Sequence, residues 1–305
     1  MSDEALISLM TLARSYTSQV TLGIGPTKEK SKTMLRQMKM AVANSGLLEH
    51  FNYTKSISAN GREFLVPVTG LSRVRITEPW MLELLPQLLS KREGAFVDVG
   101  VNLGQTLLKL RAVDLERKYV GFEPNPHCIN YVHKLLKLND LGDVSLFPVG
   151  VSEKTSQVEL MHFSESNLDS AASMIEGFRP GEKIYFRQFI SVIGSEQLVS
   201  IIGQEKVGLL KVDVEGAELE VFKGFNEILT RYKPTLLFEI LPSYSADNTF
   251  RVERQKEIYK LLRGVGYEIS RLQVDDNGHF QGMTPVDGFG IHGDLTQCEY
   301  VATVQ

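Results

Sequence analysis

The chain has 305 residues, of which 43% are hydrophobic and 23% are charged, and its formal net charge is −4. This composition is typical of a soluble globular protein with a sizeable core, and it excludes a low-complexity chain. The slight acidity argues against general affinity for nucleic acid, so we expect no nucleic-acid partner.

The sequence also lacks the usual marks of a secreted or membrane protein. The first four residues, MSDE, carry no positive side chain, and no apolar run approaches ~20 residues. Cys128 and Cys298 lie far apart and form no metal-spaced motif, so we expect free thiols in a reducing compartment. We therefore expect a cytoplasmic protein with no transmembrane segment.

Residues 1–90 differ in pattern from the rest of the chain, and we interpret them as a helical cap that binds substrate, closes a lid or forms a homo-oligomer. Residues 28–40 have helical spacing with a basic side, which suits an anionic substrate carrier, lipid headgroups or simply solvent. The pair Asn60-Gly61 predicts a hairpin turn. A helix is expected over Trp80–Leu89, directly before the central strand.

Residues 91–305 alternate between strand and helix patterns. The expected strands are Ala95–Val99, Tyr119–Phe122, Val144–Val149, Leu209–Val214, Thr235–Ile240, Tyr267–Arg271 and Tyr300–Val304. The expected helices between them are Gln105–Val113, Cys128–Asn139, Glu218–Lys223 and Arg254–Gly264. This alternation predicts an α/β fold with a mostly parallel sheet and a ligand site at the carboxyl ends of its strands. Residues 152–207 depart from it and are interpreted as an inserted β region that shapes the substrate pocket.

The segment FVDVGVNLGQT, residues 96–106, predicts a buried strand, a glycine turn and the start of a helix. Gly100 and Gly104 allow a tight turn and a close approach by a ligand. Gln105 and Thr106 open the helix, where unpaired N–H groups and the helix dipole converge. The segment therefore predicts a nucleotide site.

The spacing of this turn favours one kind of nucleotide. A dinucleotide fingerprint needs G-x-G-x-x-G, whereas this turn reads D-x-G-x-N-x-G. Asp98 suits a cationic ligand, and S-adenosylmethionine (SAM) carries a sulfonium and an ammonium. Glu123 ends the next strand, nineteen residues after Gly104, where an acid can accept hydrogen bonds from both ribose hydroxyls. Together the two features indicate SAM.

A second acidic cluster lies in LLKVDVEGAE, residues 209–218. By the two-residue period of a strand, Lys211, Asp213 and Glu215 share one side. Charges on a buried central strand are costly unless they are paired or used. Glu239 adds a carboxylate at the neighbouring strand end. The cluster is therefore either a satisfied ion network or part of a site.

From Phe96 to about Arg271 the chain resembles the FkbM-type SAM-dependent methyltransferases. The resemblance is carried by VDVGVNLGQT, GFEPNP, LLKVDVEGAELEVFKG and PTLLFEI. It implies a class I methyltransferase-like (Rossmann-like) seven-stranded sheet whose last strand runs antiparallel. It also implies SAM as the methyl donor and a small-molecule or glycan acceptor, with a hydroxyl of a sugar or polyketide-like molecule as the methylated group. Residues 189–197 depart from the Leu-Asp-Asp-like segment common in the family, which leaves the acceptor undefined.

The resemblance also implies which residues bind the donor. Asp98, Gly100, Asn102 and Gly104 would hold its methionine end, Glu123 its ribose, and Gly150 and Val151 would lie near its adenine. With Gln105 and Thr106 at the helix start, these residues make up the predicted cofactor site.

For the chemistry we assign Asp213 as the general base, with Glu215 as the next candidate. A positioned base that takes the hydroxyl proton contributes ~10²–10⁴-fold. Lys211 would orient the acceptor or the base and stabilise developing negative charge. No metal ligand is assigned, although a divalent cation held by Asp213 and Glu239 is a second hypothesis. Two other functions stay open, namely an NAD-dependent oxidoreductase of Rossmann-like fold and a non-catalytic SAM-fold binding module.

Overall fold

The computed structural model describes residues 53–69, 72–202 and 206–304, and the chain divides into two compact units. One unit comprises residues 1–56 and 65–74, and the other comprises residues 57–64 and 75–305. The helix predicted over residues 28–40 lies outside the described residues, so the interpretation of residues 1–90 as a cap stays a prediction. β1 (Tyr53–Ala59) and β2 (Arg62–Val68) form a two-stranded sheet, and Asn60 and Gly61 between them have positive φ, which confirms the predicted hairpin.

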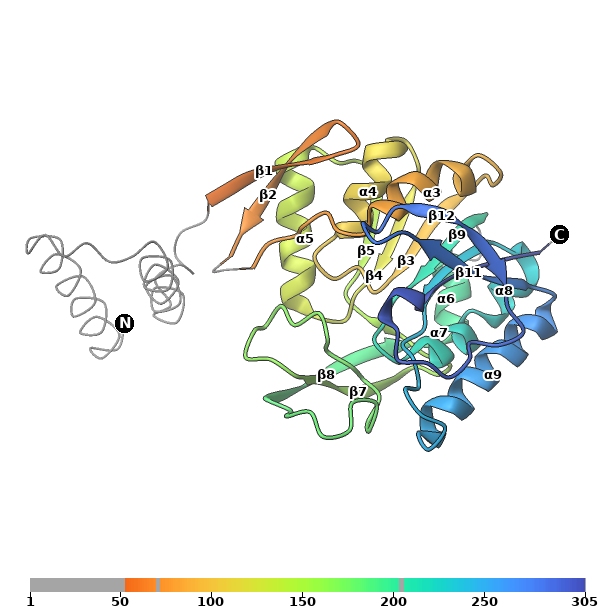
Figure 1. Ribbon diagram of the computed structural model, residues 1–305. Helices are drawn as coiled ribbons and strands as arrows, with labels where there is room; N and C mark the ends of the chain where they lie inside the picture. The colour runs from red at the N-terminus through yellow and green to blue at the C-terminus, as the bar shows by residue number, and fades with distance from the viewer. Residues whose placement is uncertain (1–52, 70–71, 203–205, 305) are drawn as a thin grey trace, which may run out of the picture. The chain divides into compact units, whose positions relative to one another are not determined.

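An eight-stranded sheet forms the centre of the larger unit, in the order β12-β11-β13-β10-β9-β3-β4-β5 (Figure 1). Its strands are β3 (Ala95–Val99), β4 (Tyr119–Phe122), β5 (Val144–Phe147), β9 (Val207–Val212), β10 (Thr235–Glu239), β11 (Glu268–Val274), β12 (Phe280–Pro285) and β13 (Glu299–Thr303). The five strands from β5 to β10 are parallel, whereas β13 runs antiparallel to both β10 and β11. This is the class I methyltransferase-like sheet with its antiparallel last strand. The prediction of seven strands was one short, because β12 pairs with β11 at the edge.

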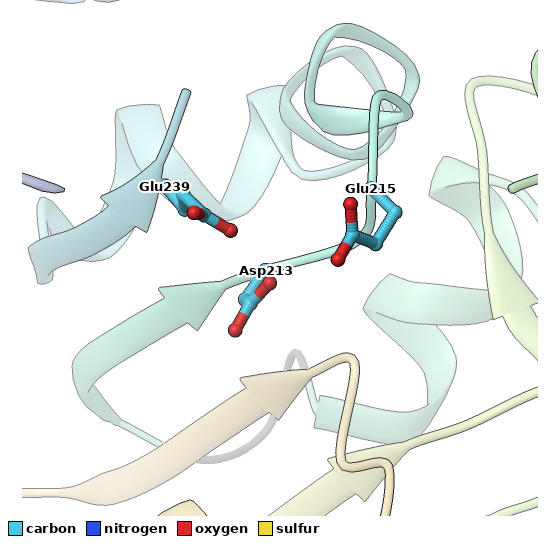
Figure 2. Close-up of side chains that lie close together, drawn as sticks. All are labelled: Asp213, Glu215 and Glu239. Atoms are coloured by element: carbon cyan, nitrogen blue, oxygen red, sulfur yellow. The ribbon is translucent and has the colours of Figure 1, made fainter. Parts of the chain in front are cut away.

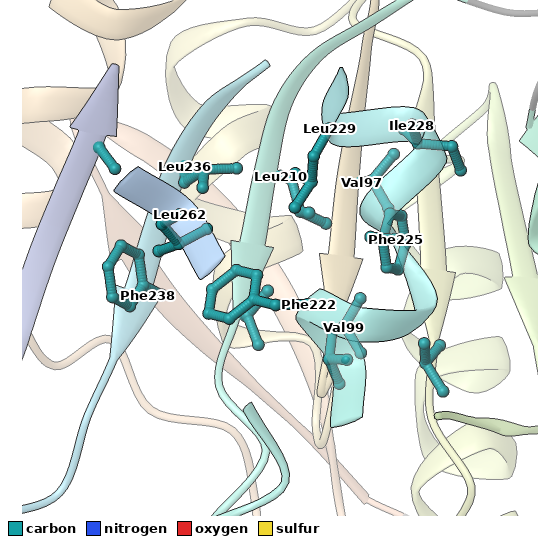
Figure 3. Close-up of a cluster of buried hydrophobic side chains, with 14 of the residues drawn as sticks. Val97, Val99, Leu210, Phe222, Phe225, Ile228, Leu229, Leu236, Phe238 and Leu262 are labelled. Atoms are coloured by element: carbon teal, nitrogen blue, oxygen red, sulfur yellow. The ribbon is translucent and has the colours of Figure 1, made fainter. Parts of the chain in front are cut away.

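Helices cover both faces of this sheet. They are α3 (Pro79–Leu89), α4 (Gln105–Val113), α5 (Pro126–Asn139), α6 (Ser195–Ile202), α7 (Glu218–Gly224), α8 (Asn226–Tyr232) and α9 (Thr249–Val265). Neighbouring residues of a strand point to opposite faces. Phe96 of β3 accordingly packs with residues of α3, α4 and α5, and Val97 packs with residues of α6 to α9. Figure 3 shows part of this second cluster, with Val97 of β3 and Leu210 of β9 together with Phe222 of α7 and Leu229 of α8.

Burial on both faces explains why the central strands read as nearly continuous apolar runs. Asp98 in β3 and Lys211 in β9 interrupt those runs, and both are almost completely buried. The two strands are direct neighbours, and the register places Asp98 beside Lys211. Both charges therefore lie together, close to the carboxyl ends of their strands.

The inserted region contributes two strands to a separate small sheet, whose third strand, β6 (Gly150–Val151), directly precedes it. β6, β7 (Ser156–His162) and β8 (Phe186–Ile193) are arranged in the order β6-β8-β7. Cys128 and Cys298 are buried free thiols, as predicted. Within the described parts of the chain, no helix combines the length and apolarity that crossing a membrane requires.

Candidate functional site

A cavity of about 320 Å³ lies where the carboxyl ends of β3, β4, β9 and β10 meet. Among the described residues that line it, six carry a carboxyl group and none is a lysine, arginine or histidine. The six are Glu78, Glu123, Asp169, Asp213, Glu215 and Glu239. Because a concave wall with one sign of charge concentrates the opposite charge, this cavity favours a cationic ligand.

The turn after β3 forms one wall of this cavity. Gly100, Asn102 and Gly104 all have positive φ, at 97°, 48° and 81°. A side chain at Gly100 would place its Cβ 1.8 Å from the backbone oxygen of Asp213. Asparagine visits the left-handed region more readily than most residues, which suits position 102. The glycine pattern thus lets the turn pack directly against the backbone after β9.

Glu123 lies at the end of β4 and is fixed by the same turn. Its Oε2 accepts a hydrogen bond from the N–H of Asn102 at 2.8 Å, and its Oε1 accepts one from the N–H of Asn125 at 2.8 Å. Burial raises the pKa of Glu123 to about 7, although the two N–H groups act to lower it. Each carboxylate oxygen has room for a further hydrogen bond. Glu123 is therefore a preoriented acceptor for a pair of hydroxyl groups.

The predicted cofactor residues fall into two groups. Gly100, Asn102, Glu123, Gly150 and Val151 line the cavity. The other predicted residues, Asp98, Gly104, Gln105 and Thr106, are absent from its described lining.

Asp98 does not line the cavity, although we expected it to contact the ligand directly. It is fully buried, and its Oδ2 accepts a hydrogen bond from the hydroxyl of Tyr119 at 2.5 Å. Burial raises its pKa to about 6, and Lys211 acts in the opposite direction. Gln105 donates to Glu78 at 2.8 Å, so its side chain fixes a wall residue. Gln105 therefore supports the wall from outside it.

The three predicted catalytic residues also differ in position. Asp213 and Glu215 line the cavity, whereas Lys211 lies behind Asp213 with its Nζ 2.9 Å from Asp213 Oδ2. The expectation that all three share one side of a strand was wrong for Glu215. β9 ends at Val212, and Glu215 has a φ of 52° in the turn after it. Its Oε2 instead lies 2.6 Å from Nη2 of Arg179, which the inserted region supplies.

Glu239 completes the acidic cluster. β10 is parallel to β9, and Phe238 lies beside Val212, so the next residues, Glu239 and Asp213, come from adjacent strand ends. Carboxylate oxygens of Asp213, Glu215 and Glu239 all lie within 4.8 Å of one another (Figure 2). Such a group can hold a divalent cation or share protons.

The electrostatics separate the roles of these groups. Burial would raise the pKa of Asp213, but Lys211, a hydrogen bond with Glu239 and the charge of Lys109 together lower it below its usual value. Burial would likewise lower the pKa of Lys211, but Asp213 and Asp98 raise it. Burial and then Asp213 raise the pKa of Glu215 to about 7, against the effect of Arg179. Asp213 is therefore ionised and oriented, as a proton acceptor needs to be.

Several lining residues were not predicted from the sequence. Glu78 precedes α3 and accepts hydrogen bonds from Gln105 and from Lys109 Nζ, the latter at 2.6 Å. Leu160 and Met174 come from the inserted region. We expected this region to shape the pocket, but the sequence did not predict which of its residues would line it. Asn125 was within reach of prediction, because its side chain caps α5 by accepting from the N–H of His127.

Comparison with known proteins gives a consistent match. The sequence model of the methyltransferase FkbM domain matches residues 98–269. Methyltransferase sdnD of Sordaria araneosa is 30% identical over 157 residues, which cover 43% of this chain and 60% of that protein. 2-O-methyltransferase NoeI of Sinorhizobium fredii (strain NBRC 101917 / NGR234) is 24% identical over 154 residues, covering 47% of this chain and 62% of that one. The chain thus spans about three fifths of the length of these relatives.

Among solved structures, methyltransferase FkbM from Methylobacillus flagellatus KT aligns with 16% identity and a TM-score of 0.42, over 69% of this chain and 43% of that one. A putative caffeoyl-CoA O-methyltransferase from Staphylococcus aureus aligns with 12% identity and a TM-score of 0.44, over 76% and 86% of the two chains. The fold assignment rests on the strand order and directions described above.

Proposed function

The chain belongs to the FkbM methyltransferase family, and we propose that it transfers a methyl group from SAM to a hydroxyl of a sugar, glycan or polyketide-like acceptor. One observation supports this most. The carboxylates of Glu123 and Asp213 line the same cavity, one suited to a diol and one to a proton. Family membership favours methyl transfer over hydride transfer. The name of 2-O-methyltransferase NoeI is in keeping with an oxygen acceptor.

The residues of the cavity fit SAM. Glu123 presents two fixed carboxylate oxygens for the ribose hydroxyls, and the acidic wall suits the positive sulfonium and ammonium. Gly100 and Asn102 would lie at the methionine end, and Gly150 and Val151 near the adenine. When bound, SAM supplies a methyl carbon on a sulfonium centre, whose carbon–sulfur electron pair stays with sulfur.

Asp213 is proposed to take the proton of the acceptor hydroxyl as its oxygen becomes methylated. The bond from Lys211 at 2.9 Å keeps this carboxylate ionised and oriented. A lowered pKa makes Asp213 a weak base, so the hydroxyl loses its proton late, as the new carbon–oxygen bond forms. Glu215 remains the second candidate, but its Oε2 is engaged by Arg179.

The test has two steps. Calorimetry with SAM and with NAD first identifies the donor. Methyl-labelled SAM is then incubated with a panel of free sugars and glycans, and labelled products are sought. Binding of SAM with label transfer supports the proposal. Binding of NAD alone would favour the oxidoreductase, and tight SAM binding without transfer to any hydroxyl would favour a binding module.

A further inference from the structure

The acidic cluster holds more carboxyl groups than cations. Of its three carboxylates, Asp213 is paired with Lys211 and Glu215 is paired with Arg179. No described lysine, arginine or histidine forms a salt bridge with Glu239. Glu239 is half-buried at the end of β10. A carboxyl group that is shielded from water and has no cation beside it tends to keep its proton.

Every charged neighbour of Glu239 bears on whether it ionises. Asp213 and Glu215 face it from the loop after β9, Glu218 from α7, and Glu299 from β13. Glu299 is its direct partner in the antiparallel register of β10 and β13. Two cations lie at the cluster, Lys211 of β9 and Arg179 of the inserted region, and they are engaged by Asp213 and Glu215. The surroundings of Glu239 are thus predominantly acidic.

We propose that Glu239 is a protonated positioning residue that donates a hydrogen bond to Asp213 and, together with Lys211, keeps that carboxylate ionised and oriented toward the acceptor. The inference rests on the proposed function, since it assigns a partner to the proposed base. Burial, then Asp213 and Glu299, raise the pKa of Glu239 to about 10, which agrees with a retained proton at neutral pH.

The arrangement resembles other pairs of carboxyl groups that share one proton. A hydrogen bond from Glu239 on one side and from Lys211 on the other leaves Asp213 with free lone pairs for the acceptor hydroxyl. A divalent cation would need Glu239 ionised as a ligand. A neutral Glu239 and a cation bound to its carboxylate therefore exclude each other, so a measurement of cation binding can decide between them.

Glu239→Gln and Glu239→Leu form the informative pair of variants. Glutamine keeps a hydrogen-bond donor and has no charge at any pH, whereas leucine has similar bulk and cannot donate. Glu299→Gln is the matched control, because it removes a carboxyl from the neighbouring strand without touching the donor to Asp213.

The first measurement is independent of activity. Infrared difference spectra of the ligand-free protein near pH 7.5 compare wild type with each glutamine variant. We expect wild type minus Glu239→Gln to show the carbonyl band of a protonated carboxyl, and this band to disappear on alkaline titration. A difference that contains only ionised carboxylate bands would overturn the proposal, even if methyl transfer is never observed.

The second measurement uses the acceptor sugar that wild type methylates. We expect Glu239→Gln to turn over about 10-fold or more faster than Glu239→Leu, because leucine cannot supply the hydrogen bond to the charged Asp213. We also expect the alkaline decline of wild-type activity to be absent in Glu239→Gln and present in Glu299→Gln. Calorimetric binding of MgCl₂ or MnCl₂ that disappears in Glu239→Gln would overturn the proposal in favour of a cation site. Failure of wild type to methylate any sugar would count against the proposed function alone.

Discussion

Replacing Gly100 by alanine tests the contact between the glycine turn and Asp213. Gly100 has a φ of 97°, and an added Cβ would lie 1.8 Å from the backbone oxygen of Asp213. Ordinary contact begins at 3.4 Å, so the two backbone segments would have to separate by about 1.6 Å. That movement would stretch the hydrogen bond that the N–H of Asp213 donates to the carbonyl of Val99 at 3.0 Å.

Two costs add at this position. A side chain in the left-handed region costs about 1–2 kcal/mol. Overpacking a well-filled site costs a further ~1–3 kcal/mol. We therefore expect Gly100→Ala to lower the free energy of unfolding by about 2–5 kcal/mol. Because misplacing a reacting group by ~1 Å can cost ~10²-fold, turnover should fall by at least that factor.

Gly266→Ala is the matched control. Gly266 has a similar φ of 100°, but no atom lies within 4 Å of the position of its Cβ. Urea unfolding should show the cost of positive φ in both variants and the larger cost in Gly100→Ala. Turnover should be near the wild-type level in Gly266→Ala. Equal losses of stability and equal turnover in the two variants would refute the close approach of Gly100 to Asp213.

Four further predictions rest on the geometry and charge of the site. Glu123→Ala should weaken SAM binding by ~1.5–3 kcal/mol in calorimetry, because hydrogen bonds to a charged group are lost, and unaltered affinity would exclude Glu123 as the ribose ligand. Asp213→Asn should lower turnover ~10²–10⁴-fold while SAM affinity changes little, and retained turnover would remove Asp213 from the role of base. SAM should bind about 10-fold more tightly than S-adenosylhomocysteine, since its additional positive charge meets an acidic wall, and equal affinities would contradict that wall. The ligand-free protein should lose stability as pH rises from about 4.5 to about 7, because burial raises the pKa of Glu123 and of Glu218 to about 7 and the unfolded chain releases those protons first. The urea midpoint should therefore be lower near pH 8 than near pH 5. A higher midpoint near pH 8 would contradict the raised pKa values of these two carboxyl groups.

Much of the central fold could be predicted because its signals are local. β3 and α4 have the predicted bounds, since an apolar run, a glycine turn and an apolar helix face succeed one another within 19 residues. β12 was missed because most of its residues are exposed and carry no apolar alternation, and its pairing with β11 defines it. α9 begins at Thr249, five residues before the predicted Arg254, where the side chain of Asn248 caps it.

The site could be predicted to the extent that it lies at strand ends. Glu123 and Asp213 come directly after buried strands, so the sequence alone placed them on the same edge of the sheet. Glu78 could not be found in this way, because Gln105 and Lys109 hold it across the packing of α3 against α4. Asp98 is the opposite case. Its place in the motif predicted a ligand contact, but its side chain is fully buried and does not line the cavity.

The most direct measurement is a crystal structure of the protein with S-adenosylhomocysteine bound. We predict that its ribose hydroxyls contact Glu123 and that its sulfur faces the carboxylate of Asp213 across the cavity. A ligand bound at another place, or a sulfur directed away from Asp213, would contradict the proposed methyl transfer.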